Sequence, residues 1–150
     1  MNDVFTLPEP IGTDYEYIMA SRHGRMVMVA GQIAKIGDNQ LHAIGRCGED
    51  VDLPTAKRNA EIAAGQVLSW LSRQHGPDEW VGRILRMTAH VAVGDEMVDI
   101  SDIADAASRV FIAALGDRGR HPRSVIGVSR LPRNSPVLLE VTAVINNRNG

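Results

Sequence analysis

The chain has 150 residues, of which 44% are hydrophobic and 23% charged, a composition typical of one ordinary folded domain and not of a disordered or repeat-built protein. Its net charge of −2 gives no general attraction for nucleic acid, so such binding would need a local basic patch. The single cysteine, Cys47, excludes an internal disulfide and a thiolate zinc cluster, and it favours a cytoplasmic location.

Residues 1–17 lack the basic start and the apolar run of a secretory signal. No window approaches the length of a membrane span, so we expect neither export by that route nor contact with a membrane. A first strand is predicted around residues 15–21. It should pair with a second strand over residues 25–33 (RMVMVAGQI) across a turn at residues 22–24.

A helix is predicted over residues 52–76, because apolar residues recur there with the 3.6-residue period. Asp52 is placed to cap it, Pro54 lies in its first turn, and Gly76-Pro77 provides a stop. The apolar stripe comprises Ala56, Ala60, Ala63, Ala64, Val67, Leu68 and Leu71.

The second half of the chain repeats this alternation of strand and helix. A strand is predicted over residues 81–93 and a helix over residues 99–116, capped by Asp99 and ended by Gly116. Two further strands, residues 124–131 and 137–145, are expected to pair with each other across the turn between them.

The element order is therefore β-β-α-β-α-β-β, without a linker or a break in composition. This order predicts an α+β fold in which residues 1–150 form a single domain, with a mixed sheet and two helices on one face.

Apolar residues occupy both faces of some predicted strands, as in the run Met26 to Ala30. Two helices cover only one face of a sheet, so the second apolar face predicts an interface between copies of the chain. The alternative is that this character belongs to a central strand whose neighbours shield it.

Common catalytic and phosphate-binding signatures are absent. The sequence has no GxxxxGK[ST], no GxGxxG after a strand and no HExxH. Its five histidines show no spacing typical of metal ligands, so we expect neither a metal nor another cofactor. His90 shares a strand face with Arg86 and Thr88. We expect it at most to support a residue that contacts a ligand, and not to contact the ligand itself.

A basic run follows the second helix: Arg118, Arg120, His121 and Arg123. Arg118 and Arg120 need no functional role, because positive charges are favourable at a helix C-terminus and common in a solvated loop. Arg123 differs, because Pro122 stiffens the approach and Ser124 begins an apolar strand. A guanidinium fixed there suits bidentate recognition of a carboxylate or a phosphate.

Several motifs together resemble the YjgF/RidA family, and most closely its chorismate-mutase-like branch. Residues 120–132 (RHPRSVIGVSRLP), followed by residues 137–144 (VLLEVTAV), resemble the closing motif of the family. Residues 29–32 (VAGQ) resemble its S-G-Q motif, and residues 116–121 (GDRGRH) its G-x-x-G-R-H. Tyr17 lies where the family has an N-terminal tyrosine.

The resemblance implies a homotrimer whose sheets surround a central barrel, with clefts for small molecules between neighbouring subunits. Family members of the deaminase type hydrolyse enamine and imine intermediates to 2-keto acids and ammonia. By the same resemblance Arg123 would bind the substrate carboxylate, backbone at Gly31 would line the cleft, and Tyr17 would come from the adjoining subunit. Asp105 lies near an asparagine of the family.

The chain departs from the deaminase pattern after the Leu-Pro turn. The family carries two glutamates there, the first assigned to the reacting water. This chain has Leu138 at the first place and Glu140 at the second. A leucine neither accepts nor relays a proton, whereas a positioned acid or base contributes about a hundred- to ten-thousand-fold in rate.

Three functions are therefore weighed. The first is imine hydrolysis, with Arg123 as the anchor, Glu140 and His121 in the pocket, and a water held by backbone near Gly31 or Val125. The second is binding of a small carboxylate metabolite without catalysis. The third, endoribonuclease activity, is disfavoured by the net charge and by the 4% aromatic content.

Overall fold

The computed structural model describes residues 6–149; residues 1–5, part of the stretch that lacks a secretory signal, lie outside this range. The elements in chain order are β1 (Ala20–His23), β2 (Met26–Gln32), β3 (Lys35–Gly37), β4 (Gln40–Leu41), α1 (Leu53–Ser72), β5 (Glu79–Ala92), α2 (Ile100–Leu115), η1 (Gly116–Gly119), β6 (Arg123–Val128), η2 (Pro132–Asn134) and β7 (Val137–Asn147).

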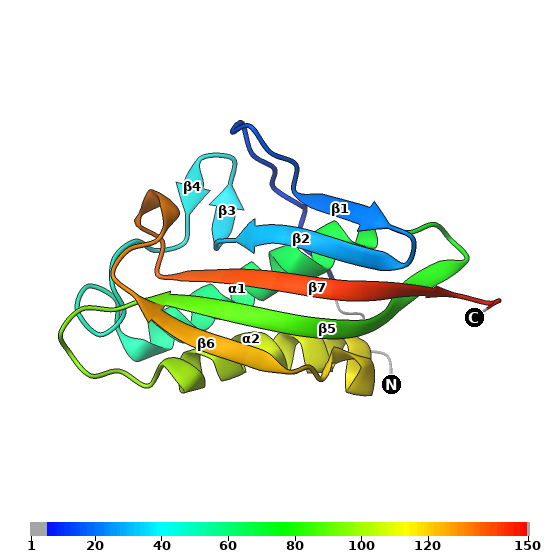
Figure 1. The fold of residues 1–150 in the computed structure, drawn as a ribbon. Helices are drawn as coiled ribbons and strands as arrows, with labels where there is room; N and C mark the ends of the chain where they lie inside the picture. The colour runs from blue at the N-terminus through cyan, green and yellow to red at the C-terminus, as the bar shows by residue number, and fades with distance from the viewer. Residues whose placement is uncertain (1–5, 150) are drawn as a thin grey trace.

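Five strands form a mixed sheet in the order β1-β2-β7-β5-β6, and both helices lie behind it in Figure 1. Neighbours are antiparallel except β5 and β6, which are parallel. The connection between these two strands is α2, as expected for a strand-helix-strand crossover. The predicted α+β class and the placement of two helices on one face are confirmed.

The predicted pairing of the last two strands is wrong. β7 inserts between β2 and β5, and β6 pairs only with β5, from Met87↔Arg123 to Ala92↔Val128. A short turn favours a hairpin locally, but the crossover through α2 leaves β6 at the sheet edge. The residues between β6 and β7 therefore pass over the end of β5, and they include the short η2 turn.

The N-terminal strand also lies later than predicted. β1 spans Ala20–His23, and the chain reverses at Gly24, whose φ of +62° suits a residue without a side chain. Tyr15 and Tyr17 therefore lie in a loop before the sheet. The small β3-β4 hairpin was not predicted, because strands of three and two residues are too short to show periodicity.

The helices begin where their caps predict. The Asp52 carboxylate accepts a hydrogen bond from the backbone N–H of Thr55 at 2.9 Å, and Asp99 accepts one from Asp102 at 3.1 Å. α2 ends at Gly116 as predicted. α1 ends at Ser72, a few residues before the predicted stop, and the carbonyl of Gln74 instead accepts a hydrogen bond from the Arg22 guanidinium at 2.9 Å.

The hydrophobic core lies between the helices and the covered face of the sheet. Alanines dominate the helix surfaces, which lets the two helices and the sheet approach closely. β7 contributes every second residue: Val137, Leu139, Val141, Ala143 and Ile145.

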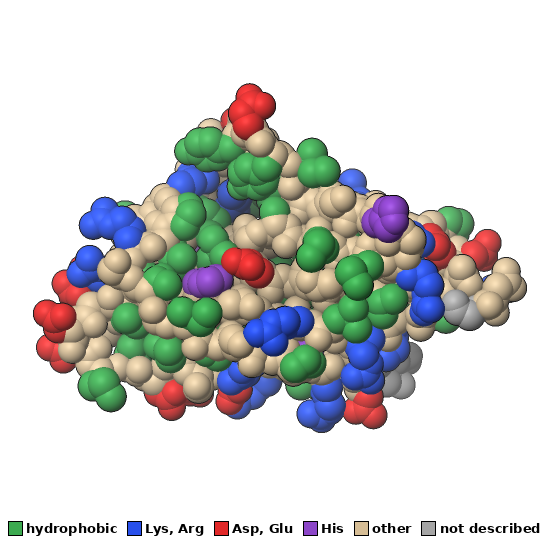
Figure 2. All heavy atoms as spheres, viewed as in Figure 1, with side chains coloured by type: hydrophobic (Ala, Val, Ile, Leu, Met, Phe, Trp, Pro, Cys, Tyr) green, Lys and Arg blue, Asp and Glu red, His purple; other side chains and the backbone are tan. Residues whose placement is uncertain are grey.

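The other face of the sheet has no helix over it. Figure 2 views the molecule from this face and shows hydrophobic side chains among polar ones. Met26, Met28 and Ile126 are 47%, 59% and 43% exposed, so neighbouring strands do not shield them. The apolar second face that the sequence predicts is therefore present and uncovered in the single chain.

Candidate functional site

Arg123 opens β6 on the helix-covered face of the sheet edge, where α2 holds its guanidinium. Nη1 lies 2.7 Å from Oδ1 of Asp105 and donates to the Ser108 hydroxyl at 2.9 Å, and Nη2 donates to the Ser101 carbonyl at 3.2 Å. These three contacts use three of the five guanidinium N–H groups. The N–H of Nε and one of Nη2 have no partner within residues 6–149 and can serve a further acceptor.

His121 supports this arrangement through Ser108, which contacts both His121 and Arg123. Its Nδ1 lies 2.6 Å from the Gly119 carbonyl, which only accepts, so Nδ1 carries a proton. Burial lowers the pKa of His121; the hydrogen bond to Gly119 opposes this shift, and the positive charge of Arg123 adds to it. The neutral ring then accepts at Nε2 from the Ser108 hydroxyl at 3.0 Å. The Ser108 oxygen in turn accepts from Arg123, which fixes the direction of the whole chain of bonds.

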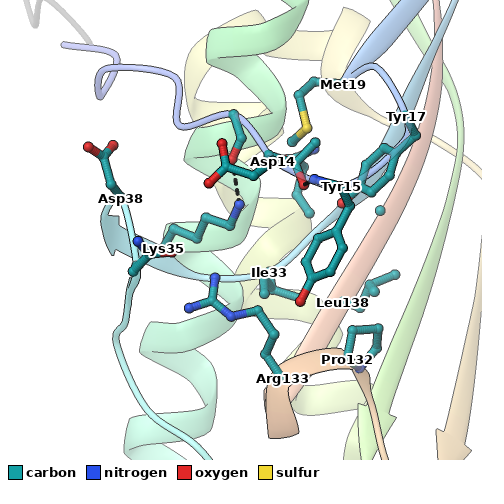
Figure 3. Close-up of a pocket in the computed structure, with 15 residues that line it drawn as sticks. Asp14, Tyr15, Tyr17, Met19, Ile33, Lys35, Asp38, Pro132, Arg133 and Leu138 are labelled. Atoms are coloured by element: carbon teal, nitrogen blue, oxygen red, sulfur yellow. Dashed lines mark hydrogen bonds between the residues drawn. The ribbon is translucent and has the colours of Figure 1, made fainter.

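A cavity of about 1060 Å³ opens at the other side of the sheet, between the loop before β1, the end of β2 and the η2 turn. Figure 3 shows Tyr15 and Tyr17 on one wall and Lys35 and Arg133 opposite. Tyr15 and Tyr17 are 69% and 51% exposed. These rings therefore give the cavity a water-exposed apolar wall.

Gly31 and Leu138 form the floor of this cavity. A Cβ atom on Gly31 would lie 2.6 Å from Cδ2 of Leu138, so any larger residue here would displace the Leu138 side chain. The register of β2 on β7 shifts between Val29 and Gln32, which places Gly31 in an irregular part of the strand. The position where the family resemblance implies a water-activating glutamate is therefore an apolar surface facing the cavity.

Lys35 and Arg133 were not singled out from the sequence. The sequence places Arg133 in a turn, and its one signal is its position directly after the Leu-Pro motif. Its φ of 57° and the φ of 58° at Asn134 are left-handed, a conformation that costs a non-glycine residue about 1–3 kcal/mol. Strain of this kind is typical of sites where the fold directs a side chain to a particular place.

Glu140 lies apart from both Arg123 and the cavity, on the face of the sheet that no helix covers. Its Oε1 is 2.9 Å from Nε2 of His90 on β5. It does not line the cavity. Val125 lies two residues after Arg123 and packs against the core at the sheet edge.

The single chain thus separates the predicted residues into two groups. Arg123, Asp105, His121 and Val125 lie at the β6 edge, whereas Tyr17 and Gly31 lie beside β2. β7 and β5 stand between these edges, and at about 4.8 Å per strand the separation is roughly 14 Å or more. One small ligand cannot contact both groups in one copy.

Within residues 6–149, no three His, Cys, Asp or Glu side chains cluster as metal ligands would. No helix of this range has the length and apolar character to cross a membrane.

Known proteins resemble the chain along most of its length, although no family model matches it. Protein TCP17 of Trypanosoma cruzi is 25% identical over 142 residues, which cover 94% of this chain and 88% of that protein. A crystal structure of a protein of unknown function from Agrobacterium tumefaciens is 27% identical, with a TM-score of 0.83 and coverage of 95% and 87% of the two chains.

Two Escherichia coli structures connect the fold to a family. The YjgF gene product and TdcF with bound serine are each 20% identical, with TM-scores of 0.64 and 0.62, and the matches cover 91% of this chain and 93% of theirs. At this identity they establish the fold and no more. The chain therefore has the fold of the YjgF/RidA family, as its sequence motifs predicted.

Proposed function

We propose that the chain binds small 2-keto and 2-imino acids in a cleft between two copies and hydrolyses the imines to 2-keto acids and ammonia. The observation that carries this proposal is the Arg123 guanidinium, oriented by α2 with two N–H groups left for an acceptor. A carboxylate accepts from such a pair in a bidentate manner. The solved TdcF structure with serine shows a small carboxylic acid bound to a protein of this fold.

The cleft is proposed to join the two separated groups. One copy would contribute the β6 edge with Arg123, and the next would contribute the cavity with Tyr17 and Gly31. The exposed apolar face of the sheet supports association of copies. The trimer implied by the family resemblance is the assembly we propose.

The reaction needs water and no redox partner. The water oxygen bonds to the imine carbon while one of its protons passes to the imine nitrogen, which gives a carbinolamine. The carbinolamine hydroxyl then loses its proton to the amine nitrogen, the C=O bond forms, and the C–N bond breaks to release ammonia. An enamine first takes up a proton on carbon to become the imine. Arg123 would hold the acid group so that the C=N bond faces the Gly31 backbone, which supplies orientation rather than proton transfer.

Binding without catalysis is the second candidate, and Leu138 is the observation that favours it. The side chain lines the cavity and contacts Gly31, so no carboxylate activates water from that position. Endoribonuclease activity is the third candidate, and a structure similar to this chain, 22% identical, is named a putative endoribonuclease of Shewanella oneidensis. The net charge of −2 and the 4% aromatic content disfavour RNA binding.

The test generates 2-aminoacrylate in situ with a dehydratase and times the release of the 2-keto acid. Wild-type protein should exceed the buffer rate, and Arg123→Gln should lose that excess. Arg120→Gln is the matched control, because Arg120 is exposed and its side chain pairs, among residues 6–149, only with Asp117. If wild type and Arg123→Gln both match buffer, hydrolysis is wrong; calorimetry with 2-oxobutyrate then decides whether binding survives.

A further inference from the structure

Two cations meet in the cavity beside β2, and neither has a role in the function proposed above. Lys35 begins β3, and Arg133 lies in the η2 turn almost a hundred residues later. Figure 3 shows both side chains reaching into the cavity from different elements, with the Arg133 guanidinium beneath the Lys35 side chain.

We propose that Lys35 and Arg133 form a second anion subsite, so that the preferred ligand carries a carboxylate for Arg123 and, at its other end, a second carboxylate or a phosphate group. This inference rests on the proposed function, because it assigns the far end of the ligand in the same cleft.

The donors of the pair are largely free. The Lys35 ammonium donates one hydrogen bond, to the Gly12 carbonyl at 2.7 Å, and an ammonium has three donors. The Arg133 guanidinium has neither a hydrogen bond nor an ion pair with residues 6–149. A planar fork of this kind matches the oxygens of a carboxylate or a phosphate.

The backbone holds Arg133 in place before any ligand arrives. The Asn134 N–H donates to Leu131 O at 3.0 Å and the Ser135 N–H to Pro132 O at 3.1 Å, while Asn134 O accepts from the Gly45 N–H at 2.7 Å. These bonds fix the left-handed turn on both sides of the residue. A cation oriented by its backbone loses less freedom on binding than one on a flexible loop.

Electrostatics in the cavity also favour an anion. Burial, and then the positive charge of Arg133, lowers the pKa of Lys35, while the nearby charges of Asp14 and Asp38 raise it to a smaller extent. Asp14 and Asp38 line the same cavity, but within the described chain neither forms an ion pair with Lys35 or Arg133. An anion placed between the two cations would pair directly with both.

The experiment compares two acids of equal chain length by calorimetry on the full chain at fixed ionic strength. 2-Oxoglutarate and 2-oxopentanoate differ only in the terminal carboxylate. The diacid should bind wild type roughly tenfold or more tightly, the effect of one charge-assisted hydrogen bond or more. Arg133→Gln and Lys35→Gln should each reduce this preference, because the diacid then loses an interaction that 2-oxopentanoate never makes.

Arg58→Gln is the control for overall charge, since Arg58 is an exposed residue of α1 whose sole ion-pair partner in the described part of the chain is Glu61. This variant should keep the preference. A ligand of the same length ending in a phosphonate shows which anion the subsite prefers, and tighter binding of either doubly acidic ligand supports the inference.

The outcomes separate this inference from the proposed function. If both acids bind equally and Arg123→Gln weakens both, the second subsite does not exist although the Arg123 site does. If the preference for the diacid persists in Arg133→Gln and in Lys35→Gln, the subsite is likewise refuted. If neither acid binds wild type, the proposed function fails first.

Discussion

The Arg123 side chain is oriented by groups on another element, the helix α2. Asp105, Ser108 and the carbonyl of Ser101 all come from α2, which packs beside β6. The neutral His121 ring leaves the Ser108 oxygen lone pairs free for Arg123. The sequence predicted a rigid arginine at a strand start, but the helix residues that orient it carry no motif that would reveal them.

Replacement of Ser108 tests this orientation. Ser108→Ala should weaken 2-oxobutyrate binding by less than Arg123→Gln does, since the ion pair to Asp105 stays, and a loss of about 1 kcal/mol is expected for one hydrogen bond. Calorimetry measures the difference. Ser72→Ala is the control, because that hydroxyl donates only within α1, to Ser69 O at 2.7 Å. Equal losses in Ser108→Ala and Ser72→Ala would remove the orienting role.

Leu138 gives a second prediction at the same scale. Leu138→Glu restores a carboxylate at the cavity floor, and a positioned base should raise the rate of imine hydrolysis about a hundred- to ten-thousand-fold. Leu138→Gln has a similar shape without the basicity and should leave the rate near that of wild type. The dehydratase-coupled assay measures both. Equal rates for the two variants would show that no reacting water lies at this place.

Secondary-structure elements are joined at their ends by one bidentate ion pair. Arg22 of β1 contacts both carboxylate oxygens of Glu79 at the start of β5, at 2.9 and 2.7 Å, and also the Gln74 carbonyl after α1. The hydrogen bonds from Arg22, and then from the Gly76 N–H, lower the pKa of Glu79 to about 2. Glu79 therefore links the N-terminal strand, the end of α1 and the longest strand.

The pH dependence of stability follows from this lowered pKa. The contribution of Glu79 is fully present above its ordinary pKa near 4.5 and disappears as the pH falls towards 2. Glu79→Gln should therefore be less stable than wild type at pH 7, and the gap should narrow between about pH 5 and pH 2. Urea unfolding across this range measures it, with Glu61→Gln as the control, since the half-exposed Glu61 carboxylate forms, within residues 6–149, only a long ion pair with Arg58, at 3.8 Å. A constant gap would contradict the assignment.

The sequence predicts the helices better than it predicts the pairing of the strands. Capping residues and apolar periodicity predict α1 and α2 well because both signals are local. Strand pairing is not local: β7 lies between β2 and β5, and only the crossover through α2 excludes the expected hairpin of β6 and β7. The cavity beside β2 depends on that topology, because η2 reaches it from between β6 and β7, and so Arg133 was not identified beforehand.

The whole molecule leaves one face of its sheet uncovered, and we predict that copies of the chain associate through it. Met28→Glu places a charge on this face and should convert the assembly to smaller species in sedimentation velocity. Met97→Glu is the matched control, since Met97 is 98% exposed outside the sheet and should not alter the sedimentation. A wild-type protein that sediments as a monomer at all concentrations would refute the assembly.

The central claim is that one copy supplies Arg123 and the next supplies the cavity, and mixed assemblies test it most directly. Arg123→Gln is co-expressed with a Lys35→Glu/Arg133→Glu variant, whose cavity repels acids, each under its own affinity tag. Trimers purified through both tags contain two subunits of one variant and one of the other. In either combination, one of the three clefts joins an intact Arg123 from one copy to an intact cavity from the next.

Calorimetry with 2-oxopentanoate should then find one site per mixed trimer, against three in wild type and little or no binding to either parent variant. Mixed trimers that bind no better than their parents would place the whole site within a single copy and contradict the account.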